Sequence, residues 1–146
     1  MRSFAPNYNP QILYIFINTK VTTRLFEKVN GTHCNPGPGT LVDQVIVESD
    51  GPKLFDFYMV ANVNPATATA LPVHFIVAEN TTNLEKTEIE DFTHQQTYGY
   101  FGWAGPCKLP ATVMYAKKIA AYADENKFAE KTKAPNVNLS DFMHYI

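Results

Sequence analysis

The chain has 146 residues, of which 45% are hydrophobic and 18% charged, with a formal net charge of −2. This composition is typical of one globular domain with enough apolar side chains to bury a core. The negative balance excludes nucleic-acid binding through an overall basic surface, so any such binding must depend on cations placed locally.

The cysteines and the first residues indicate a compartment. Cys34 and Cys107 lie far apart and in no metal-binding spacing, which argues against a zinc site and favours free thiols. The start of the chain does not have the pattern of a signal peptide, and the apolar run Ile12–Ile17 is too short to span a membrane. We therefore expect a cytoplasmic or nuclear protein without a membrane partner.

Four strands are predicted in the first half of the chain. Ile12–Ile17 is a continuous apolar run, which predicts a strand buried on both faces of a parallel or mixed sheet. Thr40–Val47 should form the second strand, after a proline-glycine loop. Leu54–Val60 should form the third strand, and His74–Ala78 the fourth. Along the third, one face should carry Phe55, Phe57 and Met59, and the opposite face Asp56, Tyr58 and Val60.

Two helices are predicted in the second half. The first begins near Asn83 as N-cap, with Ile89 and Phe92 on one side, and the second begins at Pro110. Strands followed by helices indicate an α/β layered unit. A first strand buried on both faces would need neighbours, so we also expect a missing N-terminal partner from the same chain or another subunit.

Seven stretches, in order along nearly the whole chain, together resemble the C-terminal portion of the Piwi domain of Argonaute and Piwi proteins. They are Tyr8–Ile15, Lys20–Phe26, Asn35–Asp43, Asp56–Val60, Pro72–Val77, the loop and helix within Tyr100–Ala120, and Leu139–Ile146. The Gly-Trp-x-Gly sequence beginning at Gly102 and the apolar last residue are more similar to the Piwi branch than to the Argonaute branch.

The resemblance implies an α/β, partial RNase H-like fold, with a mixed sheet followed by two packing helices. Residues 1–146 would then be the C-terminal portion of a Piwi domain, incomplete as a domain. The resemblance also implies a channel for a small guide RNA and its target RNA in RNA silencing. That channel would be shared with the rest of a Piwi and Mid module, in the same or another chain.

Candidate RNA contacts lie in two places. Lys20, Thr22 and Arg24 alternate along an extended segment, so their side chains should project to one side, as a comb for phosphates. By pattern alone a solvated loop is the better reading, but the family's guide contacts fall on Lys20 and Arg24. The resemblance also marks Lys108 as a guide contact, and Tyr100 could stack or pack.

The resemblance implies that this chain alone does not carry the residues needed to cleave RNA. In the family, acidic residues hold two divalent metals for phosphoryl displacement, and the first three acidic positions lie upstream of this segment. The fourth, usually histidine, aligns with Lys117, whose ammonium has no lone pair for a metal. Lys117 is thus a degenerate catalytic position, which could contact a phosphate or lie along the helix edge.

Three further residues carry expectations. By resemblance, the terminal carboxylate of Ile146 would hold a cation, such as Mg²⁺, beside the guide 5′ phosphate; a disordered tail is the alternative. His74 is interpreted as a satisfied core histidine and Trp103 as a core aromatic.

Two other functions remain open: the tail of a longer guided RNA endonuclease, and a truncated interaction module or relic without RNA binding.

Overall fold

The computed structural model describes residues 9–48, 54–62, 68–125 and 138. It consists of two compact units, Met1–Phe92 and Thr93–Ile146, whose boundary falls inside helix α1. The first unit contains all the described strands. The second contains the end of α1, a long loop and helix α2.

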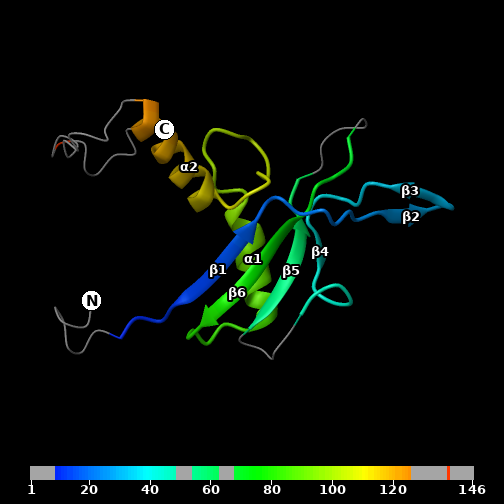
Figure 1. Cartoon of the computed structure of the whole chain (residues 1–146), viewed down its shortest axis with the longest axis horizontal. Helices are drawn as coiled ribbons and strands as arrows, with labels where there is room; N and C mark the ends of the chain where they lie inside the picture. Colours follow the sequence, from blue (N-terminus) through cyan, green and yellow to red (C-terminus); the bar gives the residue numbers. More distant parts are fainter. Residues whose placement is uncertain (1–8, 49–53, 63–67, 126–137, 139–146) are drawn as a thin grey trace. The chain divides into compact units, whose positions relative to one another are not determined.

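The first unit is built on a four-stranded sheet in the order β1-β6-β5-β4, with every described pairing antiparallel (Figure 1). A separate hairpin, β2 with β3, turns at Asn30 and Gly31, both with positive φ. The strands are β1 (Leu13–Asn18), β2 (Glu27–Val29), β3 (Thr32–Cys34), β4 (Thr40–Val42), β5 (Phe55–Val60) and β6 (Val73–Asn80).

The core of this unit lies on one face of β5 and β6. Because side chains alternate along a strand, the register Phe57↔Phe75 puts both rings on the same face, where they stack at 5.1 Å. Phe55, Met59 and Val77 are buried with them. The predicted alternation along Leu54–Val60 is therefore confirmed.

Helix α1 (Lys86–Gln96) begins three residues later than its predicted N-cap, Asn83. The backbone N–H of Glu85 donates to the Glu88 carboxylate at 2.8 Å, which satisfies a donor at the helix start. Lys86 forms an ion pair with Asp43 at 3.0 Å and lies 5.5 Å from the centre of the Phe55 ring, which ties the start of α1 to the sheet.

The prediction that the first strand is buried on both faces is wrong. β1 is an edge strand of the described sheet, and its burial alternates with a period of two. Tyr14 and Phe16 are each 52% exposed, whereas Ile15 and Ile17 on the other face are half-buried. A continuous apolar run does not reveal which neighbour is present, so the pattern could not distinguish an edge strand from a central one.

The second predicted strand is also shorter than expected. β4 ends at Val42, and the predicted range cannot continue to Val47 as one strand, because Val45 adopts a φ of 68° that lies outside the β region and is strained for a β-branched residue. Val45 is 99% exposed, whereas Leu41 within β4 is half-buried.

The second unit contains α2 (Ala111–Glu125), and the two predicted helices are thus both present. On α1, Ile89 is fully buried as expected, but Phe92 is 48% exposed. Thr93 and Thr97, at helical spacing from Ile89, are buried in its place. Within the described ranges, neither helix combines the length and the apolar character that a membrane crossing requires.

Glu90 on α1 provides a test of this packing. Its Oε1 is buried without a hydrogen-bond partner among the described residues. Burial, with the nearby Asp43 carboxylate, raises the pKa of Glu90 above its ordinary value, and Lys86 offsets part of the rise. A carboxyl with a raised pKa holds its proton more tightly in the folded chain, so stability falls as pH rises from below the ordinary value through the folded pKa.

We therefore expect Glu90→Gln to remove that fall and to raise the free energy of unfolding near neutral pH by about 1 kcal/mol. Urea denaturation at a series of pH values measures both effects. Glu79→Gln, at an exposed carboxylate on β6, is the matched control and should leave the pH profile unchanged. If the free energy of unfolding depended on pH equally in Glu90→Gln and in the unmodified chain, Glu90 would not have the raised pKa described above.

Candidate nucleic-acid interface

The predicted row of phosphate contacts, Lys20, Thr22 and Arg24, is called the comb below and follows directly after β1. Lys20, Thr22 and Arg24 are exposed, while Val21 and Thr23 between them are half-buried. This alternation continues the period of β1, as expected for an extended backbone. The alternation thus places the three exposed side chains on one side of a single segment.

Local hydrogen bonds hold this segment in shape. The backbone N–H of Lys20 donates to Asn18 Oδ1 at 3.1 Å, at the point where β1 ends. Arg24 Nη1 donates to the carbonyls of Val21 at 3.0 Å and Thr23 at 2.9 Å. A guanidinium has five N–H donors, so these bonds use only part of its capacity and orient the group at the surface.

The candidate contacts of the second unit are less exposed. Tyr100 and Lys108 are both half-buried, in the loop between α1 and α2. The Tyr100 ring packs against Tyr115 of α2 at 5.2 Å between ring centres. Lys117 is exposed on α2. The comb belongs to the first unit and these residues belong to the second, and their RNA contacts stay predictions.

No metal centre appears in the part of the chain that the structure describes. Its ranges hold no group of three or more His, Cys, Asp or Glu side chains that could bind a metal ion. Cys34 is exposed and Cys107 is buried, and both are free thiols, as expected. Burial raises the pKa of the Cys107 thiol, which disfavours the thiolate that a metal would need. Ile146 lies outside the described residues.

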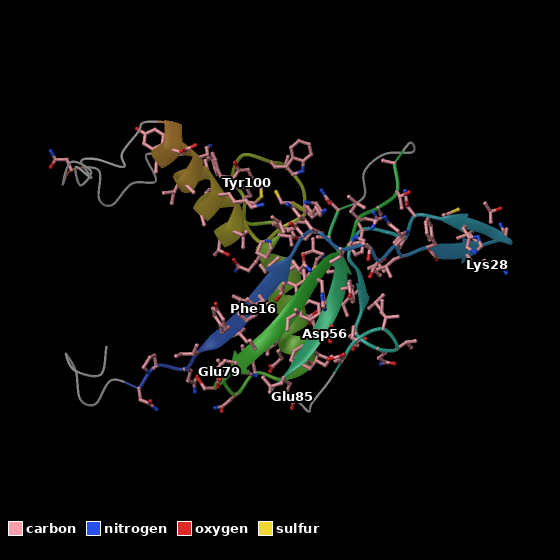
Figure 2. The ribbon with its side chains drawn as sticks, in the orientation of Figure 1. Phe16, Lys28, Asp56, Glu79, Glu85 and Tyr100 are labelled. Carbon is pink, nitrogen blue, oxygen red and sulfur yellow. The ribbon has the colours of Figure 1, made fainter. Side chains whose placement is uncertain are left out.

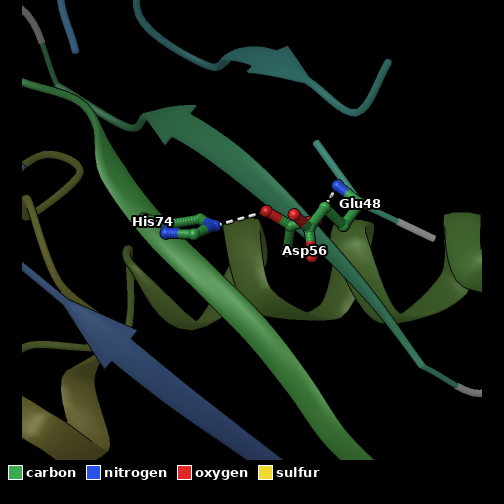
Figure 3. A network of polar contacts seen from close by, with 3 residues as sticks. All are labelled: Glu48, Asp56 and His74. Carbon is green, nitrogen blue, oxygen red and sulfur yellow. Dashed lines mark hydrogen bonds and ion pairs between the residues drawn. The ribbon is translucent and has the colours of Figure 1, made fainter. Parts of the chain in front are cut away.

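A polar network occupies the sheet face opposite the aromatic core. His74 Nε2 lies 2.5 Å from Asp56 Oδ2, and the backbone N–H of Glu48 donates to Asp56 Oδ1 at 2.5 Å (Figure 3). The Tyr58 ring stacks on His74 with 4.2 Å between ring centres. These side chains line a pocket of about 500 Å³, together with Ile46, Leu54 and Ile76.

This network confirms that His74 has a hydrogen-bond partner, as expected, but the predicted core position is wrong, because His74 is half-buried on the face opposite the aromatic core. Both oxygens of Asp56 accept hydrogen bonds, so the pair serves the fold, and a buried carboxylate needs such partners. Asp56 was not singled out from the sequence. An aspartate inside an otherwise apolar strand, with a histidine in the next strand, is a signal that could have identified it.

The core role predicted for Trp103 is wrong. Its side chain is 64% exposed, and that of neighbouring Phe101 is 88% exposed. The buried residues of the same loop include Cys107 and Leu109, close to the start of α2. The apolar composition of the loop could not show which of its side chains are buried in the fold.

Comparison with known proteins assigns the chain to a family. The model of the Piwi domain matches residues 1–127. The chain belongs to the Piwi domain family. Piwi-like protein 1 of Gallus gallus is 30% identical over 146 residues, which is 100% of this chain but 16% of that protein. This Piwi-domain chain therefore spans about one sixth of the length of that relative.

Solved structures agree with this assignment. The crystal structure of Drosophila Piwi matches 78% of this chain and 15% of its own, with 33% identity and a TM-score of 0.65. The structure of Kluyveromyces polysporus Argonaute with a guide RNA matches 99% of this chain and 20% of its own, with 21% identity and a TM-score of 0.70. The predicted Piwi-branch membership and RNase H-like fold class are confirmed.

The Asp56–His74 pair of this Piwi-domain chain should be energetically coupled. Removing either side chain leaves a buried polar partner unsatisfied, so we expect Asp56→Ala to destabilise the chain by about 1–3 kcal/mol. A double-mutant cycle with His74→Ala should give a coupling energy of about 0.5–3 kcal/mol, measured by urea denaturation. Glu79→Ala combined with His74→Ala is the control and should be additive. A coupling near zero would show that the pair contributes nothing.

Proposed function

We propose that this chain forms part of a guide-RNA channel in a Piwi-branch protein that acts in RNA silencing. The observation that carries the proposal is the exposed row Lys20, Thr22 and Arg24 on one extended segment, in a chain of the Piwi domain family. The guide RNA bound in the Kluyveromyces polysporus structure supports the class of ligand. Target RNA would pair with the guide in the same channel.

The physical basis of binding would be electrostatic and local. The net charge of −2 repels a polyanion at long range, so affinity must come from cations that reach phosphates directly. Arg24 can offer several N–H donors to one phosphate, while Lys20 acts as a point charge. The hydroxyl of Thr22 between them can donate to a phosphate oxygen.

The rest of the channel would come from outside this chain. The chain spans 16% of the length of the chicken relative, and we propose that the remainder of a Piwi and Mid module completes the site. Tyr14, Phe16 and Ile76 form an exposed apolar surface on β1 and β6, which supports such a partner because apolar surfaces favour burial. The protein would act in the cytoplasm or nucleus.

The proposal includes a cation at the guide end. The Ile146 carboxylate would hold Mg²⁺, and the ion would neutralise repulsion between that carboxylate and a 5′ phosphate. No step of the proposed function passes through this ion, and the phosphate comb acts without it.

Salt dependence tests the comb. We expect Lys20→Ala combined with Arg24→Ala to weaken binding of single-stranded RNA and to reduce the slope of log K against log salt by about 1.4, because two phosphate contacts are lost. Fluorescence anisotropy of a labelled RNA measures this. Lys28→Ala, on the β2–β3 hairpin labelled in Figure 2, removes an exposed charge outside the comb and should change the slope less. An unchanged slope in the double variant would overturn the proposal.

Cleavage is not expected from this chain. A two-metal reaction requires several carboxylate ligands, and the described residues present no such cluster beside Lys117. Neither the unmodified chain nor Lys117→His should therefore cut a guide-paired RNA in Mg²⁺ or Mn²⁺, as followed by gel electrophoresis of labelled target. Metal-dependent cutting by Lys117→His would show that the chain contains the missing ligands.

A further inference from the structure

The loop between α1 and α2 is fastened at its base. The backbone N–H of Cys107 donates to the carbonyl of Thr97 at 2.8 Å, which closes a loop of residues 97–107. Thr97 is fully buried and its hydroxyl donates to the carbonyl of His94 at 2.7 Å. Cys107 is also buried. The two ends of the loop are thus fixed against the protein.

The middle of the loop is held as well. Tyr115 of α2 accepts a hydrogen bond from the backbone N–H of Phe101 at 2.9 Å, and its hydroxyl lies 3.5 Å from the carbonyl of Gly99. A Cβ on Gly102 would lie 3.0 Å from the Tyr100 ring, so the backbone passes close over that ring. The Tyr100 ring of this loop, labelled in Figure 2, packs against the Tyr115 ring of α2.

These anchors leave two large aromatic side chains facing solvent. Phe101 is 88% exposed and Trp103 is 64% exposed, although burying each would be worth about 1.5–3 kcal/mol. Because Tyr100 and Tyr115 already fix the backbone, the exposure is part of the held conformation of the loop. An exposed pair of aromatic side chains on a fixed loop indicates a binding surface.

The surrounding charge favours one class of ligand. Along the sequence, Lys108 lies in the same loop and Lys117 and Lys118 lie on α2, while the next acidic residues, Asp124 and Glu125, are the last two of α2. Aromatic faces combined with cations are the combination that binds single-stranded nucleic acid, because bases stack on the rings and phosphates meet the charges. An apolar protein partner would gain nothing from the lysines.

We propose that Phe101 and Trp103 form a stacking platform for unpaired bases of single-stranded RNA. The proposal rests on the proposed function for its ligand, and adds a base-contacting surface to the phosphate contacts of the comb. Stacking tolerates any sequence, since every base has a π face. A duplex should bind less well, because its bases are already stacked on one another.

Trp103 is the only tryptophan in the chain, so it reports its own environment. The 146-residue chain is titrated with a labelled single-stranded oligoadenylate, and anisotropy of the label is recorded beside tryptophan emission, excited where tyrosine does not absorb. We expect quenching that follows the binding curve. Inorganic polyphosphate, which carries charge but no bases, should not quench.

Variants separate stacking from charge. Trp103→Ala and Phe101→Leu should each weaken oligoadenylate binding by about tenfold, while Trp103→Phe, which keeps a ring, should retain most of the affinity. Phe92→Ala removes an aromatic side chain of α1 that is 48% exposed and is not part of the loop, and should leave affinity unchanged. Circular dichroism of each variant verifies that the fold is intact.

The outcomes distinguish this proposal from the function on which it rests. RNA binding by anisotropy with neither quenching nor a loss of affinity in the variants would overturn the stacking platform while leaving the guide-channel proposal in place. The loop would then be a docking surface for protein. Absence of any RNA binding would overturn both.

Discussion

The antiparallel pairing of β5 with β6 is the constraint on which the described sheet depends. This one register places Phe57 on Phe75 in the core, and on the opposite face it brings Tyr58 and Asp56 to His74. The same register therefore determines the contacts of the core and of the polar network together, because both follow from the same alternation. A slip of one residue in β5 would move its aromatic rings to the face of the polar network and Asp56 to the face of the aromatic core.

That dependence explains why His74 has a structural role. Asp56 accepts from both His74 and the backbone of Glu48, which also joins the segment after β4 to β5. A buried carboxylate with two partners is satisfied and specific, and it would lose both partners if the strands shifted. The chemistry proposed for the chain lies instead on exposed segments at the ends of elements. The comb follows the end of β1, and the loop that carries Phe101 and Trp103 follows the end of α1. Functional residues are commonly found on loops that a rigid scaffold positions.

The sequence predicted the alternating strand at Leu54–Val60, both helices and the family, because those depend on short-range periodicity and on ordered motifs. The exposed alternation of Lys20, Thr22 and Arg24 also followed from an extended backbone. The sequence did not predict that β4 ends at Val42, because a positive φ at a β-branched residue such as Val45 is not favoured by any residue propensity. Nor did it predict the edge position of β1, which depends on the neighbouring strand.

The sequence by itself determined the types of side chain, their spacing and hence the family, because these are properties of a linear pattern. Only the tertiary structure decided which apolar residues face water. Trp103 and Phe16 are as apolar as Phe57, yet only Phe57 is buried, because burial depends on what packs against a side chain. The partner of Asp56 was decided in the same way, since His74 is 18 residues distant along the chain and adjacent only after β5 and β6 pair.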